Sequence, residues 1–383
     1  MRVLFSTLPS YGHFYPMVPL ASALRAAGHD VLVAAAGNFA GAILGAGLPH
    51  VETASSIEMR RCIGVDRAGE PVPDPPEEEG KLARSGRGFG RAGLAALDAA
   101  DDLVDTLRPD VVVVEPTEYA VRLAAARRGI PFVVHDWGLP VPSVMADAVR
   151  EELAPERAER DPGERAARPD LVLRTSPGDA LPADDAGFRM RFVPYNGVAT
   201  LPSWLLTPAS RPRVCLTFGT MIGNYPGIDR AVGGLAALLA GQGYEVLLAV
   251  SAEVAAALPP LPDRVRQIGY TPLNAVLPGC DLLVHHGGSG SAMTALATGT
   301  PQVVMPHAAD QFSNSAHVHA LRAGIGLTRG HTGPDEVREA CASVLGDPAY
   351  AARAGEVAAE LAARPGPVAL VAEVERLAAR VAA

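Results

Sequence analysis

The sequence predicts an α/β protein built from two doubly wound parallel-sheet domains. Short apolar segments alternate with helical patterns from one end of the 383-residue chain to the other, and a proline-rich segment interrupts this alternation near the middle. Strands that are apolar on both faces and separated by helices indicate parallel sheets covered on both sides. A chain of this length also fits two domains of ordinary size better than one.

The first half of the chain carries the elements of the first predicted sheet. Apolar runs indicate strands at residues 2–8, 30–35, 110–114, 131–135, 171–174 and 191–193. Helical patterns lie between them at residues 17–28, 39–45, 94–107 and 119–128. Residues 55–87 fit neither pattern, because they hold four prolines and a run of three glutamates. We expect a long irregular insertion there, and such loops are often functional.

The second half repeats the alternation after a break in composition. Residues 201–212 hold three prolines and no helical period, so we assign them as the linker between domains. Strands are expected at residues 214–218, 245–250, 265–268, 281–285 and 302–305, with helices at residues 229–241, 273–277, 291–298, 311–323, 335–345, 350–363 and 368–381. The predicted domains are residues 1–200 and 213–365, and residues 366–383 are expected to form a helix that packs back on the first domain.

Composition narrows the classes of function. The net charge of −9 argues against a general nucleic-acid-binding protein, which would present a basic face. The four cysteines form no CxxC pair, so we expect reduced thiols and no cysteine metal site. The chain starts directly with a strand, and no apolar run reaches the roughly 18 residues that a membrane helix needs. These features predict a cytoplasmic protein without a membrane span.

The segment at residues 281–296, DLLVHHGGSGSAMTAL, predicts an anion site. A buried strand runs into two histidines and a glycine turn, and a helix follows. The free N–H groups of the first helical turn and its positive dipole end attract a phosphate, and the glycines let it approach the backbone. Ser289 and Ser291 can add hydroxyl donors, and His285 or His286 can donate to a pyrophosphate oxygen. A plain glycine turn without a ligand is the alternative.

Other strand ends on the same predicted edge carry polar or aromatic groups. Asp310 and Gln311 follow a strand and begin a helix, where Asp is favoured as a cap but where a carboxylate and an amide can also hold sugar hydroxyls. Thr220 follows the first strand of the second half and offers a hydroxyl. Tyr270 follows a later strand, where it is either a rim residue or a ring that stacks on a nucleobase. Ligands bind at the carboxyl ends of parallel strands, so these residues predict a binding edge.

His13 is the candidate general base. It lies in the loop after the first strand, and an imidazole suits base work near neutral pH. A catalytic histidine usually needs a carboxylate to hold its tautomer, and both Glu115 and Asp136 end a strand on the same edge. The alternative for a single histidine in a loop is a surface or structural role.

Three motifs together resemble a known family. They are GHFYP at residues 12–16, GYTPLNAVLPGCDLLVHHGGSGS at residues 269–291 and PHAADQFSNS at residues 306–315. In this order and spacing they resemble the family 1 glycosyltransferases of GT-B fold that decorate antibiotics and other natural products in actinomycetes, of the calicheamicin and urdamycin type. The resemblance implies two Rossmann-like domains facing across a cleft. It implies an inverting transfer of a sugar, without a metal ion or other cofactor, from a nucleotide diphosphate donor in the second domain to a small-molecule acceptor in the first.

The resemblance also assigns roles to individual residues. His13 is implied as the base. Glu115 stands where an aspartate is frequent in the family, and Asp136 lies in a segment that can carry the base in relatives making carbon–carbon glycosides, so both stay open as its partner. Donor contacts are implied for Thr220, Tyr270, Leu273, His285, Gly288, Ser289, Gly290, Ser291, Asp310 and Gln311. Acceptor contacts are expected from Tyr11, Phe14 and Trp137 and from the segments at residues 55–87 and 138–145.

The donor is expected to be a thymidine diphosphate deoxysugar, with a uridine nucleotide as the alternative, and the acceptor a polyketide-like aglycone. A nucleotide-sugar epimerase on the same two-domain plan would need no acceptor and would want more carboxylates near the sugar. A non-catalytic auxiliary partner of a transferase is the alternative outside the enzymes, and intact His13, His285 and Asp310 argue against it. The sequence leaves the sugar, the type of glycosidic linkage and a homodimer open.

Overall fold

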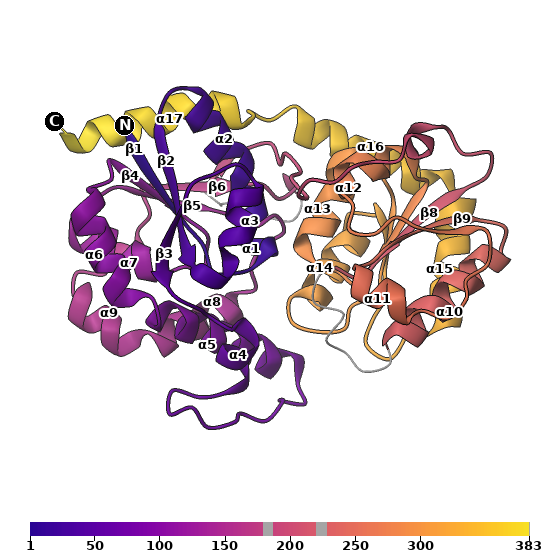
Figure 1. Ribbon diagram of the computed structural model, residues 1–383, viewed down its shortest axis with the longest axis horizontal. Helices are drawn as coiled ribbons and strands as arrows, with labels where there is room; N and C mark the ends of the chain where they lie inside the picture. Colours follow the sequence, from indigo (N-terminus) through magenta and orange to yellow (C-terminus); the bar gives the residue numbers. More distant parts are fainter. Residues whose placement is uncertain (179–186, 220–227, 383) are drawn as a thin grey trace. The chain divides into compact units, whose positions relative to one another are not determined.

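The protein forms two compact units, drawn in Figure 1. This computed structural model describes residues 1–178, 187–219 and 228–382. The first unit consists of residues 1–176, 187–193 and 364–382, and the second of residues 177–178, 194–219 and 228–363. The chain therefore passes from the first unit into the second and returns to the first for its last helix.

The first unit is built on a parallel sheet. Its strands are β1 Arg2–Ser6, β2 Asp30–Ala36, β3 His50–Ala54, β4 Val111–Val114, β5 Phe132–His135, β6 Leu171–Arg174 and β7 Phe188–Arg189. Among the described residues these strands pair in the order β3-β2-β1-β4-β5-β6-β7. Every pairing is parallel, as the sequence predicts.

Helices connect the strands of the first unit and cover the sheet. They are α1 Tyr11–Phe14, α2 Val18–Ala26, α3 Ala40–Gly45, α4 Met59–Gly64, α5 Glu78–Leu94, α6 Leu97–Leu107, α7 Ala120–Arg127, α8 Ser143–Glu152, α9 Ala154–Arg160 and α17 Pro367–Ala382. The four valines of β4 are fully buried between these layers. Burial of each such side chain contributes about 1.5–3 kcal/mol. The returning helix α17 lies beside α2, as Figure 1 shows in yellow and indigo.

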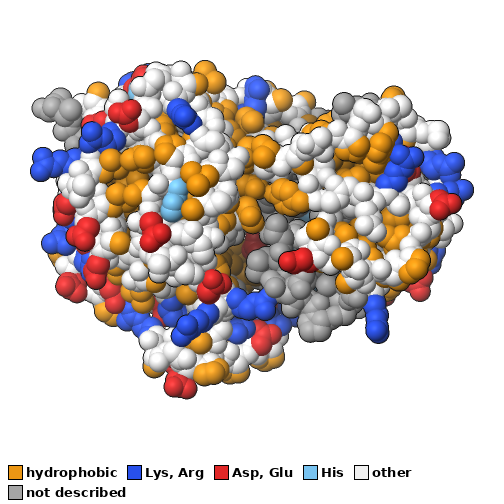
Figure 2. Space-filling model, in the orientation of Figure 1, with side chains coloured by type: hydrophobic (Ala, Val, Ile, Leu, Met, Phe, Trp, Pro, Cys, Tyr) orange, Lys and Arg blue, Asp and Glu red, His pale blue; other side chains and the backbone are white. Residues whose placement is uncertain are grey.

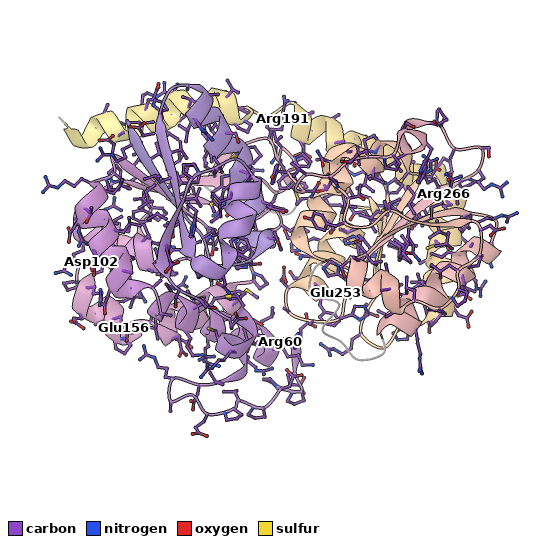
Figure 3. All side chains as sticks on the ribbon, viewed as in Figure 1. Arg60, Asp102, Glu156, Arg191, Glu253 and Arg266 are labelled. Carbon is purple, nitrogen blue, oxygen red and sulfur yellow. The ribbon has the colours of Figure 1, made fainter. Side chains whose placement is uncertain are left out.

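The segment at residues 55–87 differs from the expected irregular insertion. It contains α4, which Arg60 marks in Figure 3, and the first part of α5. Helix α5 is glycine-rich, and Gly86 and Gly90 face α8 so closely that a Cβ at either position would overlap it. Close backbone packing thus overrides the poor helix propensity of glycine, which is why the pattern alone did not predict this helix.

The strand predicted at residues 191–193 is absent from the described structure. The short strand β7 ends the sheet instead, and the backbone N–H of Arg191 donates to Pro365 of the returning chain at 2.9 Å. The backbone N–H of Arg191 therefore finds its hydrogen-bond acceptor in the last part of the chain and not in a neighbouring strand.

The second unit repeats the same plan. Its strands are β8 Arg213–Thr217, β9 Glu245–Ala249, β10 Val265–Gln267, β11 Leu282–His285, β12 Gln302–Val304 and β13 Gly324–Gly326. Within the described part of the chain they pair in parallel in the order β10-β9-β8-β11-β12-β13. Its helices are α10 Ile228–Gly241, α11 Ala252–Ala257, α12 Leu273–Val276, α13 Ser289–Thr298, α14 Gln311–Ala320, α15 Pro334–Gly346 and α16 Pro348–Ala362.

The expected linker at residues 201–212 is packed into the second unit. Leu205 is buried in a cluster with Cys215 and Leu247, and Trp204 packs against the same cluster. The change of unit falls earlier, between residues 193 and 194. Apolar residues between the prolines therefore bury themselves against the second sheet, and the predicted domain boundary at residue 200 moves accordingly.

The visible surface carries charges of both signs. Figure 2 shows basic and acidic side chains interspersed over the face in view, with apolar side chains between them. Acidic groups such as Asp102 on α6 and Glu156 on α9 mark the outer helices of the first unit in Figure 3. Across the residues with assigned positions, no helix combines the length and the apolar character needed to cross a membrane.

Candidate active site

In each unit the strand order reverses at one place, and the predicted functional residues gather there. In the first sheet the reversal lies between β1 and β4, where His13 lies in the short helix α1 that follows β1 and Glu115 directly follows β4. In the second sheet it lies between β8 and β11, and the loops after them carry Gly219 and the glycine turn. Such reversals open a crevice at the carboxyl ends of the strands, where open α/β sheets bind ligands.

His13 and Glu115 form a hydrogen-bonded pair, called here the His13–Glu115 pair. The His13 Nδ1 atom lies 3.0 Å from Glu115 Oε1. An ionised carboxylate only accepts, so Nδ1 carries the proton and Nε2 keeps its lone pair. His13 is 8% exposed, while Glu115 is wholly buried. The pair therefore presents an imidazole in the tautomer that a general base requires.

Glu115 is held by three further donors. The backbone N–H of Thr117 donates to Oε2 at 2.7 Å, and the Thr117 hydroxyl contacts Oε1 and Oε2 at 3.0 and 2.9 Å. The indole N–H of Trp137 donates to Oε2 at 2.9 Å. Burial by itself raises the pKa of the Glu115 carboxyl, but the interaction with His13 and the hydrogen bonds from Thr117 outweigh burial and lower the pKa. The buried carboxylate stays ionised.

Asp136 has a different partner. The guanidinium of Arg174 lies 3.0 Å from Asp136 Oδ1, and Asp136 is almost completely buried. The sequence left both carboxylates open as the partner of His13, and the structure places Glu115 in contact with it. Trp137, the neighbour of Asp136, contacts both members of the His13–Glu115 pair.

The three expected acceptor residues occupy different places. Tyr11 is 40% exposed and packs beside Phe39 at 5.4 Å between ring centroids. Phe14 is 1% exposed and belongs to the core, so its ring offers no surface to an acceptor. Trp137 is 5% exposed and holds Glu115 rather than standing open. Phe89 was not predicted, although its ring lies 5.1 Å from that of His13, because it belongs to the glycine-rich helix α5.

The glycine turn of the second unit joins β11 to α13. Gly287 has a φ of +95°, and Gly288 caps α13 without a side-chain hydrogen bond. Helix α13 begins at Ser289, and its first intrahelical bond at this end is from Ala292 N–H to Gly288. A Cβ on Gly290 would meet no heavy atom of the described residues within 4 Å. The first turn of α13 thus presents backbone N–H groups at a helix N-terminus, with room beside Gly290, which is the arrangement that binds anions.

His285 lies beneath this turn instead of facing a ligand. It is wholly buried, its Nε2 is 2.9 Å from Gln302 Oε1, and its Nδ1 accepts the N–H of Gly287 at 3.1 Å. Burial lowers its pKa to about 4, so it is neutral. Both ring nitrogens are engaged, and this corrects the expected direct contact between His285 and the donor. His285 is the last residue of β11, and its buried ring supports the glycine turn from below.

His286 lies next to the turn, between the ends of β8 and β11. A Cβ on Gly219 would come within 2.5 Å of its Cε1 atom, and a Cβ on Gly288 within 2.7 Å of its Nε2 atom. Its Nδ1 is buried without a hydrogen-bond partner among the residues that the structure describes. Burial lowers its pKa to about 3, which keeps the ring neutral. The two glycines make room for this imidazole at the strand-order reversal.

The start of α14 is tied to the glycine turn. Asn314 is buried and its side-chain amide donates to Asp310 Oδ2 and to the carbonyl of Gly287, both at 2.9 Å. The amide oxygen of Gln311 accepts the backbone N–H groups of His307 and Ala308 at 2.9 and 3.1 Å. These bonds fix Asp310 and Gln311 at the same end of the sheet as the turn. Asn314 links the two loops through these two hydrogen bonds, and the sequence did not predict this link.

The loop after β10 is organised by an unpredicted residue, Asn196. Its side-chain oxygen accepts the backbone N–H of Asn274 at 3.0 Å, and its side-chain amide donates to Thr294 of α13 at 3.1 Å. Its backbone carbonyl accepts the hydroxyl of Tyr270 at 3.1 Å. Tyr270 is 47% exposed and Leu273 is buried at the start of α12. Asn196 follows no strand and matches no pattern, so only the fold reveals it.

Two remaining expectations concern Thr220 and metal binding. Thr220 lies outside the residues that the structure describes. Over the described ranges, no group of three or more His, Cys, Asp or Glu side chains is arranged to hold a metal ion. The four cysteines are free thiols.

Comparison with known proteins places the whole chain among antibiotic glycosyltransferases. It is 40% identical over 385 residues to the L-demethylnoviosyl transferase of Streptomyces niveus, covering 97% of each chain. It is 37% identical, with a TM-score of 0.86, to glycosyltransferase SsfS6 of Streptomyces sp. SF2575 in complex with thymidine diphosphate, covering 98% of this chain and 99% of that one. It is 32% identical, with a TM-score of 0.84, to the spinosyn rhamnosyltransferase SpnG in complex with spinosyn aglycone, covering 98% and 100%.

The fold and these likenesses define a glycosyltransferase of the GT-B class, as the sequence predicted. The chain belongs to the family described as Erythromycin biosynthesis protein CIII-like. It matches the N-terminal domain of that family over residues 22–72 and 92–219 and the C-terminal domain over residues 235–377. It is thus an enzyme of the type that transfers sugars in antibiotic biosynthesis.

Proposed function

We propose that this glycosyltransferase transfers a deoxysugar from a thymidine diphosphate donor to a hydroxyl group of a polyketide-like aglycone, with inversion and without a metal ion. The first unit serves as the acceptor domain and the second as the donor domain. The observation that carries the proposal is the His13–Glu115 pair, with Nδ1 bonded to the buried carboxylate at 3.0 Å. Such a pair can supply a base to an acceptor hydroxyl.

The reaction follows from these groups as one displacement. His13 Nε2 takes the proton of the acceptor hydroxyl as the acceptor oxygen attacks the anomeric carbon. The bond from that carbon to the diphosphate oxygen breaks, and the diphosphate leaves on the opposite face, so the configuration inverts. The imidazolium that forms is stabilised by the Glu115 carboxylate. Base catalysis of this kind contributes about 10²–10⁴-fold.

The second unit stabilises the leaving group in this proposal. The amide N–H groups at Ser289, Gly290 and Ser291 open helix α13 and are proposed to donate hydrogen bonds to the diphosphate as its negative charge develops. His286 is the histidine proposed to donate to a phosphate oxygen, because both nitrogens of His285 already have partners. Asp310 and Gln311 are proposed to hold the sugar hydroxyls, and Tyr270 to cover the base.

The names of the relatives support the substrate classes. One relative is a transferase of a demethylnoviosyl sugar, and a structural neighbour is bound to thymidine diphosphate. Another neighbour is bound to spinosyn aglycone. A thymidine nucleotide and a large aglycone are therefore the donor and acceptor classes to test first. We also propose the cytoplasm as the site of action, since free thiols fit a reducing compartment.

A donor and acceptor screen tests the proposal. Thymidine and uridine diphosphate sugars are incubated with a panel of polyketide-like acceptors, and products are detected by mass spectrometry and their anomeric configuration by NMR. We expect transfer with inversion from a thymidine nucleotide. His13→Ala should lower kcat by about 10²–10⁴-fold, whereas His331→Ala, at an exposed loop position, should leave it unchanged. Near-normal turnover of His13→Ala with an alcohol acceptor would show that the base is another group.

A further inference from the structure

Trp137 lies in the loop after β5 and makes two distinct contacts with the His13–Glu115 pair. Its indole N–H donates to Glu115 Oε2 at 2.9 Å. Its ring lies 4.1 Å from the His13 ring, measured between centroids, at an interplanar angle of 42°. Because the side chain is 5% exposed, little of its surface is open to an acceptor. Trp137 is thus placed to act on the pair rather than on the substrate.

The hydrogen bond matters because Glu115 is a wholly buried charge. A desolvated carboxylate is stable only when donors replace the lost water. On Oε2 those donors are the backbone N–H and hydroxyl of Thr117 and the indole N–H of Trp137. The Thr117 hydroxyl has a single proton, and it lies within hydrogen-bond distance of both Oε1 and Oε2. The indole N–H is therefore the side-chain donor committed to Oε2 alone.

The ring contact limits how the imidazole can turn. Trp137 lies on one side of His13, and Phe89 meets it edge-on at 5.1 Å and 84°. The rings of Trp137 and Phe89 are themselves perpendicular at 6.2 Å. With Nδ1 bonded to Glu115 and the ring plane restricted by two aromatic neighbours, the direction of Nε2 is fixed. A base with a fixed lone pair loses little entropy in reaching the acceptor proton.

We propose that Trp137 is a positioning residue of the catalytic pair, which holds Glu115 in its ionised, oriented form and through it sets the tautomer and direction of His13. This inference rests on the proposed function of His13 as the base. It replaces the expectation that Trp137 contacts the acceptor. Thr117 donates to the same carboxylate and belongs to the same support.

Steady-state kinetics separate positioning from acceptor binding. Trp137→Phe keeps an aromatic ring but removes the N–H donor, and Thr117→Val removes the hydroxyl while keeping the shape. We expect each to lower kcat by about 10- to 100-fold, as for the loss of a hydrogen bond to a charged group, with the acceptor KM within about twofold. A raised acceptor KM at unchanged kcat in Trp137→Phe would make Trp137 an acceptor contact and overturn the proposal.

A double-mutant cycle tests whether Trp137 acts through His13. If it does, Trp137→Phe should cost less than about twofold when it is introduced into His13→Ala, because the group that it positions is gone. A full loss in both backgrounds would show that Trp137 acts by another route. Normal activity of His13→Ala would refute His13 as the base. The hydrogen bond between Trp137 and Glu115 would then still be tested by NMR spectroscopy.

The indole proton gives that reading without catalysis. The chain has two tryptophans, so Trp204→Phe leaves Trp137 as the sole indole. Trp204 lies in the second unit, beneath the guanidinium of Arg266, which Figure 3 labels on β10. This variant should keep normal activity. In ¹⁵N-labelled Trp204→Phe, the indole N–H resonance should move upfield when Glu115→Gln is added. A resonance that does not respond to Glu115→Gln would refute the bond on which the proposal depends.

Discussion

Helix α5 packs on α8 through glycine, so Gly86→Ala is expected to destabilise the first unit. A Cβ at Gly86 would lie 2.9 Å from Ala148 Cβ and 3.0 Å from the Met145 carbonyl carbon, and it would overlap the Met145 carbonyl oxygen. Carbon atoms in ordinary contact are about 3.5–4.0 Å apart. The helix must therefore move by roughly 0.5–1 Å, because the obstacle is backbone and not a flexible side chain.

Two opposing terms set the magnitude. Forcing extra volume into a packed interface costs about 1–3 kcal/mol, and alanine gains up to about 1 kcal/mol over glycine in a helix. The expected result is a net loss of about 1–2 kcal/mol. Phe89 lies on the same helix and touches the His13 ring, so the displacement should also lower kcat, by up to about 10²-fold for a shift approaching 1 Å.

The matched control is Gly93→Ala in the same helix. The nearest heavy atom to a Cβ at Gly93 is Leu153 Cδ1 at 4.0 Å, which is an ordinary contact. This variant should keep its activity and gain a few tenths of a kcal/mol, up to about 1 kcal/mol. Urea unfolding and kcat are measured for both variants. A Gly86→Ala protein as stable as Gly93→Ala would refute the close-packing account of α5.

Two further predictions concern a buried acid and the donor site. Burial raises the pKa of Glu118 from 4.5 to about 7, so the folded state resists its ionisation and stability is lost as pH rises from 4.5 toward 7. Glu118→Gln resembles the protonated acid. Measured by urea unfolding, its free energy of unfolding relative to that of the parent should therefore rise by about 2–3 kcal/mol from pH 5 to pH 8. A difference between the two proteins that stays constant over this range would contradict the raised pKa of Glu118. Asn314→Ala removes the bonds to Asp310 and Gly287, and it should raise the donor KM about tenfold with kcat nearly unchanged; an unaltered donor KM would show that this link does not shape the site.

The sheets and the helix order were accessible from the sequence because their signal is local. The four consecutive valines of β4 and the apolar run of β11 are strands buried on both faces, and the pattern predicts them directly. Helix α5 was not accessible, since its glycines disfavour a helix until α8 is packed against them. The packing of residues 201–212 was not accessible for a related reason, because Leu205 is buried by Cys215 and Leu247 of the second sheet, and the local pattern does not show these contacts.

The site residues likewise fall into those that local sequence predicts and those that only the fold reveals. His13 and the glycine turn follow from their positions after strands, but the choice between Glu115 and Asp136 depends on Arg174, which lies far away in the sequence. One feature of the sequence could have indicated that His285 is buried. Gln302 is a polar residue in an otherwise apolar strand, and a buried amide of this kind needs a hydrogen-bond partner on a neighbouring strand.

Binding of the product nucleotide tests the central claim most directly. Crystals of the protein soaked with thymidine diphosphate should show the two phosphates against the amide N–H groups at the start of α13, with the His286 ring alongside. Both phosphates bound elsewhere, with the N-terminus of α13 left to solvent, would contradict the account of how this enzyme holds its donor.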